Sequence, residues 1–73
     1  MNGNEFIRKV RRLARRDGVA VVHEAAKGKG SHGRLYYASR FTTIKDPRKE
    51  IGIGLRNKIL RDFGIDVRDF TRA

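Results

Sequence analysis

The residues best suited to chemistry lie around one histidine, His32, in the tetrapeptide Gly-Ser-His-Gly of residues 30–33. Histidine is the only side chain whose ordinary pKa lets it gain and lose a proton near neutral pH. The candidate contacts of this region with RNA are Lys27, Lys29, Gly30, Ser31, Arg34 and Tyr36. An imidazole among cations is suited to phosphodiester chemistry, and the simpler alternative is a histidine that only contacts phosphate.

Metal-free cleavage of RNA defines what such a site must contain. A base removes the proton of the 2′-hydroxyl, an acid protonates the leaving 5′-oxygen, and cations neutralise the phosphorane. His32 can be the base or the acid, and the two lysines with Arg34 can neutralise charge. Tyr36 can stack a base or hydrogen-bond a phosphate oxygen. Flanking glycines let the backbone N–H groups approach the phosphate.

A second proton-transfer group is needed unless His32 plays both roles, and the sequence offers His23 and Glu24. A one-residue change of register exchanges the two faces of a strand. A four-residue loop over residues 27–30 would align His23 with the face of His32, whereas a five-residue loop would bring Glu24 there. Both assignments stay open at the level of sequence.

Charge and composition narrow the class of partner. The 73 residues include 18 Lys and Arg against 8 Asp and Glu, a formal net charge of +10, which favours nucleic acid over an anionic membrane. With no cysteine and two histidines that lack ligand spacing, we expect neither a metal site nor another cofactor. The length suits a single domain over residues 1–73. No apolar run approaches the length of a membrane span, so we expect a cytoplasmic protein.

A basic amphipathic helix opens the chain. Residues 5–16 place apolar side chains at helical spacing, with Arg and Lys around the other side. Asn4 is the predicted N-cap, and Gly18 is the predicted left-handed stop. Three segments of β character follow, at residues 19–25, 31–38 and 41–44. The economical arrangement of these strands is an antiparallel meander.

A second helical pattern follows Gly52 and Gly54 and ends at Gly64. Its predicted apolar stripe consists of Leu55, Ile59, Leu60 and Phe63. Residues 66–73 form a short C-terminal tail or one extra helical turn that brings Val67 and Phe70 together. The order α-β-β-β-α predicts an α+β fold with both helices packed on one face of a three-stranded antiparallel sheet.

Alternation along the second strand assigns side chains to the two faces of this sheet. The predicted working surface consists of His32, Arg34 and Tyr36. The predicted core side chains of this region are Leu35, Tyr37 and Phe41.

Several segments together resemble the HicA family of toxin mRNA interferases, and the resemblance extends from the first helix to Ile65. The segments that carry it are Gly-Ser-His-Gly at residues 30–33, Tyr36-Tyr37, Thr42-Thr43-Ile44, and the stretch from Ile51 to Ile65, which reads IGIGLRNKILRDFGI. In that family a glycine-serine-histidine strand start carries the catalytic histidine, and a helix of this pattern closes a fold similar to double-stranded RNA-binding domains. The resemblance implies that His32 is the catalytic histidine.

The function implied by the resemblance is that of a type II toxin-antitoxin system. The toxin would be a small, metal-independent endoribonuclease that cuts mRNA and is held inactive by a HicB-like antitoxin covering the site. The alternative is a non-catalytic RNA-binding module of the same fold, because the charge and the element order are shared by shape-reading RNA binders. Turnover separates the two hypotheses, whereas salt dependence does not.

Overall fold

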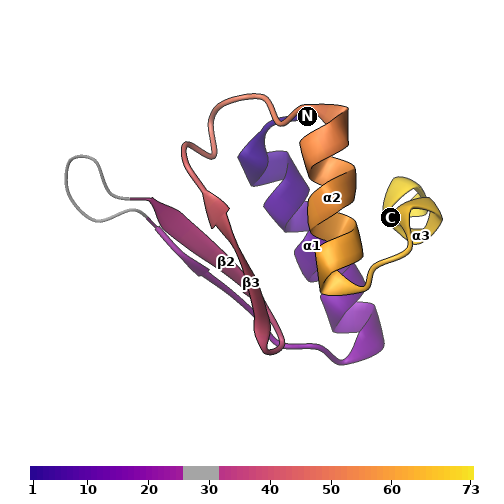
Figure 1. Ribbon diagram of the computed structural model, residues 1–73. Helices are drawn as coiled ribbons and strands as arrows, with labels where there is room; N and C mark the ends of the chain where they lie inside the picture. Colours follow the sequence, from indigo (N-terminus) through magenta and orange to yellow (C-terminus); the bar gives the residue numbers. More distant parts are fainter. Residues whose placement is uncertain (26–31) are drawn as a thin grey trace.

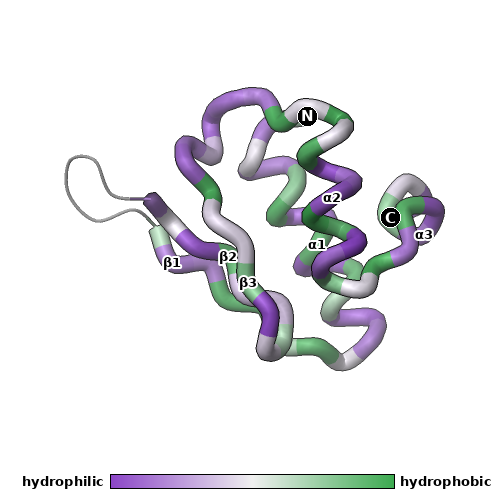
Figure 2. Tube along the Cα trace, viewed as in Figure 1, coloured by the Kyte–Doolittle hydropathy of each residue, from purple (hydrophilic) through white to green (hydrophobic). Residues whose placement is uncertain are grey.

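Helix α1, Gly3–Asp17, opens the chain in the computed structural model, which describes residues 1–25 and 32–73 (Figure 1). The helix exists because its apolar residues recur on one side and are buried there: Phe6, Ile7, Val10, Leu13 and Ala14. Gly18 ends it in the left-handed conformation, with φ 71°, as predicted. Figure 2 shows the resulting alternation of hydrophobic and hydrophilic residues along α1.

The N-cap of α1 is Asn2, so the prediction of Asn4 was wrong by two residues. The backbone N–H of Glu5 donates to the Asn2 side chain at 2.9 Å, and the N–H of Asn2 donates to the Glu5 carboxylate at 3.2 Å. These reciprocal bonds form a capping box, which satisfies N–H groups that would otherwise lack partners. Asn4 already lies inside the first helical turn.

Replacing Asn2 by alanine is expected to lower the free energy of unfolding by about 1 kcal/mol, since it removes the cap. Asn4→Ala is the matched control, because the Asn4 side chain is exposed and makes no hydrogen bond to the described residues. Urea denaturation of both variants measures the difference. Equal losses from the two substitutions would show that the cap contributes nothing beyond helix propensity.

The sheet is an antiparallel meander in the order β1-β2-β3, as predicted. Its strands are β1, Val21–Glu24, β2, Gly33–Tyr37, and β3, Arg40–Ile44. In the register of the sheet, Tyr36 lies between Val22 and Phe41, and Arg34 lies between Glu24 and Thr43. Paired residues share a face, so the register fixes which side chains meet across the strands.

Helices α1 and α2 both cover the same face of this sheet, as predicted (Figure 1). Helix α2, Ile53–Phe63, ends at Gly64 with φ 75°. Tyr37 stacks on Phe63 with ring centroids 5.2 Å apart, and the Arg40 guanidinium donates to the backbone oxygen of Asp62 at 2.7 Å. These contacts bind the sheet to α2.

A third helix, α3, Val67–Arg72, packs against α1 and α2 on their side away from the sheet (Figure 1). The Asp66 carboxylate caps it by accepting from the N–H of Arg68 at 2.8 Å, and the Arg68 contacts lower the pKa of Asp66. Phe70 is buried, with its ring centroid 5.4 Å from that of Phe6. The predicted tail is therefore an ordered helix that completes the core.

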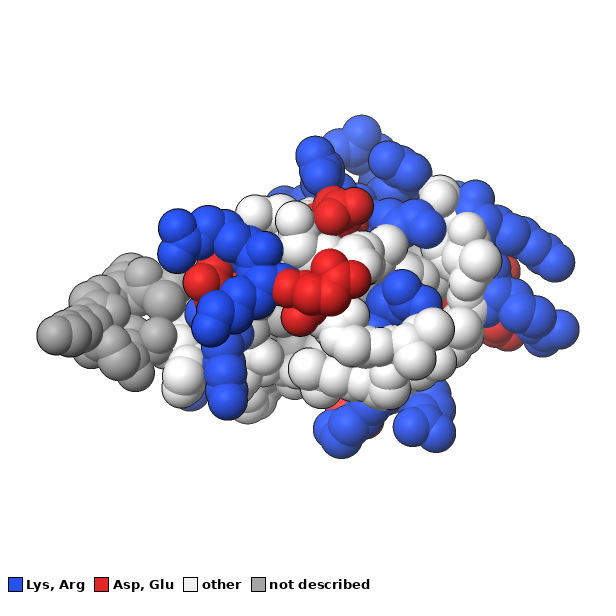
Figure 3. Space-filling model, turned by 90° about the horizontal axis from the view of Figure 1, so that it is seen from above, with Lys and Arg blue, Asp and Glu red and all other residues white. Residues whose placement is uncertain are grey.

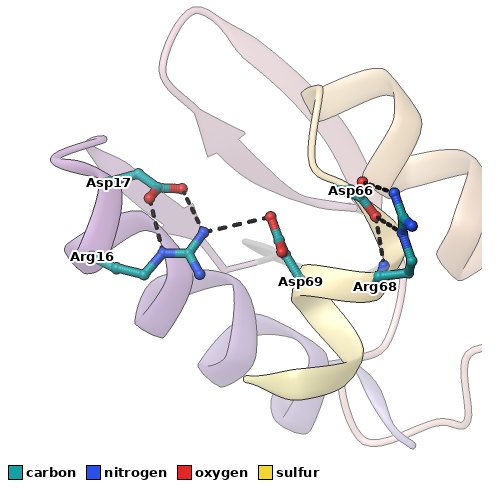
Figure 4. Close-up of polar contacts among 5 residues, drawn as sticks. All are labelled: Arg16, Asp17, Asp66, Arg68 and Asp69. Atoms are coloured by element: carbon teal, nitrogen blue, oxygen red, sulfur yellow. Dashed lines mark hydrogen bonds and ion pairs between the residues drawn. The ribbon is translucent and has the colours of Figure 1, made fainter.

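Arg16 joins α1 to α3 at the surface (Figure 4). Its guanidinium lies 2.9 Å from the Asp17 carboxylate and 3.6 Å from that of Asp69. The hydrogen bond from Arg16 lowers the pKa of Asp17. All three side chains are largely exposed, so this bridge contributes little to the stability of the fold.

The predicted stripe of α2 is correct for Ile59, Leu60 and Phe63, which are buried, and wrong for Leu55, which is 55% exposed. Leu55 lies in the first turn of α2, where it borders a cleft against the end of β3 instead of the core. No helix among the described residues is long and apolar enough to cross a membrane.

Candidate functional site

The face of the sheet opposite the helices, the open face, carries two rows of side chains. One row consists of Val22, Tyr36 and Phe41, and the other consists of Glu24, Arg34 and Thr43. All of them are exposed except Tyr36, which is half-buried. The buried residues Leu35 and Tyr37 alternate with them along β2. The predicted alternation of β2, with Leu35 and Tyr37 in the core and Arg34 and Tyr36 on the other face, is therefore confirmed.

Phe41 belongs to the open face, and its assignment to the core was wrong. It is 54% exposed, because it pairs with Tyr36 and not with Tyr37. The Tyr36 and Phe41 rings lie 5.8 Å apart at 41°. The guanidinium carbon of Arg34 lies 5.0 Å from the centroid of Phe41, in cation–π geometry. The open face thus carries a cluster of two aromatic rings and one cation.

Arg34 is a permanent cation, because a guanidinium stays protonated at any pH relevant to a protein. Tyr36 and, less strongly, the nearby Glu24 carboxylate raise the pKa of Arg34 further above its ordinary value. Glu24 lies directly across from Arg34 in the register, so one acidic side chain accompanies the cation on this face. The open face is therefore not uniformly positive.

His32 lies directly before β2 and is exposed, so its imidazole is accessible from solvent. Arg34 and Tyr36 follow it on the same strand. Four predicted contacts, Lys27, Lys29, Gly30 and Ser31, lie outside the described residues. The structure thus brings Arg34 and Tyr36 together on one face and places His32 at the strand end next to them.

Lys45 is a candidate cation that the sequence analysis missed. Gly33 pairs with Ile44, so His32 and Lys45 are the residues directly beyond that pair at one end of the sheet. Lys45 is exposed. The signal that could have revealed it is the two-residue turn between Tyr37 and Arg40, which fixes the register of the whole hairpin.

The two candidates for a second proton-transfer group lie on opposite faces. Glu24 pairs with Arg34 and belongs to the open face, whereas His23 pairs with Leu35 and points to the helix side. His23 is half-buried there, in a cleft that also includes Arg8 and Arg11 of α1. Of the two residues, Glu24 is the one that shares a face with Arg34.

Helix α1 provides a second cationic surface. Arg8, Arg11, Arg12 and Arg15 are exposed and form no ion pair with any described residue. Figure 3 shows basic side chains projecting around much of the outline of the molecule in its view, with acidic side chains in smaller patches. Since α1 covers the opposite side of the sheet, this surface and the open face lie on different sides of the molecule.

One cleft among the described residues lies between the end of β3 and the start of α2. It is lined by Thr43, Ile44, Lys45, Asp46, Lys49, Glu50, Ile51, Leu55 and Ile59. Lys45 borders this cleft as well as the strand end near His32. Within residues 1–25 and 32–73, no group of three or more His, Cys, Asp or Glu side chains could hold a metal ion.

Comparison of the chain with protein-family models, with curated proteins and with solved structures yielded no match.

Proposed function

We propose that the protein is an endoribonuclease that cleaves mRNA without a metal ion, with His32 as a general acid or base. The observation that carries the proposal is an exposed histidine at a strand end, next to an open face with a cation and two aromatic rings. The resemblance of residues 30–33 and 51–65 to HicA toxins supports the same assignment. The formal net charge of +10 is suited to an RNA substrate.

The reaction has to move two protons. The 2′-oxygen attacks phosphorus as its proton is removed, and the bond from phosphorus to the 5′-oxygen breaks as that oxygen gains a proton. The products are a 2′,3′-cyclic phosphate and a 5′-hydroxyl. His32 performs one of these transfers. Glu24 is a better candidate than His23 for the other, because it shares the open face with Arg34.

Neutralisation of the phosphorane is the other requirement. Arg34 and Lys45 are the described cations at the end of the sheet near His32. The proposal also assigns Lys27 and Lys29 to the neutralisation of this charge. Cations placed where negative charge develops stabilise the transition state more than the ground state.

The proposal extends to a cytoplasmic toxin of a type II toxin-antitoxin system, neutralised by a HicB-like antitoxin. We expect the partner that masks the site to be acidic, because its charge would then be opposite to that of this chain and would accelerate association. The resemblance to HicA toxins, together with the charge, carries this part of the proposal.

The test is an assay of the purified protein on a long unstructured RNA in EDTA. We expect fragments with cyclic phosphate and 5′-hydroxyl ends, and no cutting of the DNA of the same sequence, which lacks the attacking 2′-hydroxyl. RNA that is bound but left whole would contradict the proposal and support a non-catalytic RNA-binding module.

A further inference from the structure

We propose that the open face binds an unpaired RNA base, stacked on Phe41 beside Arg34 and Tyr36. The inference rests on the proposed function, from which it takes RNA as the ligand. It narrows the substrate class to single-stranded RNA. Nothing in the sequence pattern placed Phe41 at a binding surface.

The first argument is the exposure of an aromatic ring without a core role. Phe41 is 54% exposed, although the other three phenylalanines, Phe6, Phe63 and Phe70, are all buried. An isolated exposed ring needs no explanation, but this one lies beside Tyr36 with ring centroids 5.8 Å apart. Two neighbouring aromatic rings on an uncovered sheet form the type of platform on which bases stack.

The second argument is the chemistry of Arg34. Its guanidinium carbon lies 5.0 Å from the centroid of the Phe41 ring, and the guanidinium is permanently charged. A guanidinium can stack on a base with its plane and attract a phosphate with its charge. An aromatic surface with a cation at its edge is thus complementary to a nucleotide, which combines a flat base with an anion.

The third argument is the position of this platform relative to His32. Tyr36, the partner of Phe41, lies three residues along β2 from Gly33, which is roughly 10 Å at the rise of a strand. A base held on Phe41 would therefore position a nearby phosphate toward the strand end that carries His32. In a duplex the bases already stack on each other, so only unpaired RNA can use the platform.

The experiment measures the affinity of a labelled single-stranded RNA by fluorescence anisotropy, in a His32→Ala background so that the RNA stays intact. Phe41→Ala should raise the dissociation constant by roughly 5- to 150-fold, the range for loss of one stacked base. Phe41→Trp should retain binding. The chain has no tryptophan, so quenching of the new indole by RNA reports contact at this position directly.

Val22→Ala is the matched control, because Val22 lies on the same face and is 52% exposed. It should leave the dissociation constant close to that of the parent. Phe41→Leu keeps a large apolar side chain but lacks the ring, and it should lose affinity for RNA as Phe41→Ala does. A loss in this variant would show that the ring itself is needed, and not just an apolar side chain. A blunt duplex of the same sequence should bind all the variants alike.

Three outcomes would overturn the inference. Phe41→Ala could bind single-stranded RNA as tightly as Val22→Ala, or lose affinity for the duplex to the same extent. Phe41→Ala could also keep its RNA affinity and lose binding to an acidic protein partner, which would make the open face a protein interface. Failure of the wild type to cut RNA would contradict the proposed function alone, since loss of affinity in Phe41→Ala would still support base stacking.

Discussion

Replacing His32 by alanine is expected to slow RNA cleavage by about 100- to 10,000-fold, the usual contribution of a positioned general acid or base. His32 is exposed and lies before β2, so the substitution should not disturb the core. The melting temperature and the affinity for RNA should therefore stay close to those of the wild type. Single-turnover cleavage of a labelled RNA in EDTA measures the rate.

His23→Ala is the control that the chain itself provides, because it removes the other histidine. His23 is half-buried on the helix side of the sheet, away from Arg34 and Tyr36. We expect the folded fraction of His23→Ala to cleave RNA at nearly the wild-type rate. A His32→Ala protein that cuts as fast as the wild type, from preparations free of contaminating ribonuclease, would refute the role of His32.

The elements that could be predicted are those specified by local chemistry. Gly18 and Gly64 both end helices with positive φ, because each follows a periodic apolar pattern and no other residue adopts that conformation so easily. The N-cap was missed although its signal was present. Asn2 stands three residues before Glu5, the spacing of a capping box, whereas Asn4 has no such partner.

The face of the sheet on which Phe41 lies depends on the length of the turn that precedes it. A three-residue turn over residues 38–40 would put Phe41 opposite Tyr37 and hence in the core. The structure has a two-residue turn, with Arg40 opposite Tyr37 and Ala38 at φ 54°, a conformation that alanine rarely adopts. Alanine at this position hides the signal that glycine or asparagine would provide. One residue of register moves Phe41 to the open face.

The candidate site shows the same dependence on register. The alternation of β2 sufficed to place Arg34 and Tyr36 together, because both belong to a single strand. The choice between Glu24 and His23 required the pairing of β1 with β2, which depends on a loop and not on any local pattern. Lys45 was missed for the corresponding reason at the other hairpin.

Truncation of Phe70 to alanine is expected to cost about 3–5 kcal/mol, the usual effect of removing a buried phenylalanine side chain. Phe70 is 2% exposed and packs against Phe6, and its ring lies 4.8 Å from the Lys9 ammonium. Helix α3 has only six residues, too few to be stable without tertiary contacts. The loss should therefore detach α3 as well as open a cavity.

Urea denaturation distinguishes these effects, with Arg72→Ala as the control, since Arg72 is an exposed residue of the same helix. Detachment of α3 in the native state would lower the slope of the transition together with its midpoint, because less surface is then left to expose on unfolding. If Phe70→Ala lowered the free energy of unfolding no more than Arg72→Ala does, α3 would contribute little to the stability of the fold. The expected cost is instead comparable to the entire stability of many small domains, which makes residues 66–72 part of the fold that positions β2 and His32.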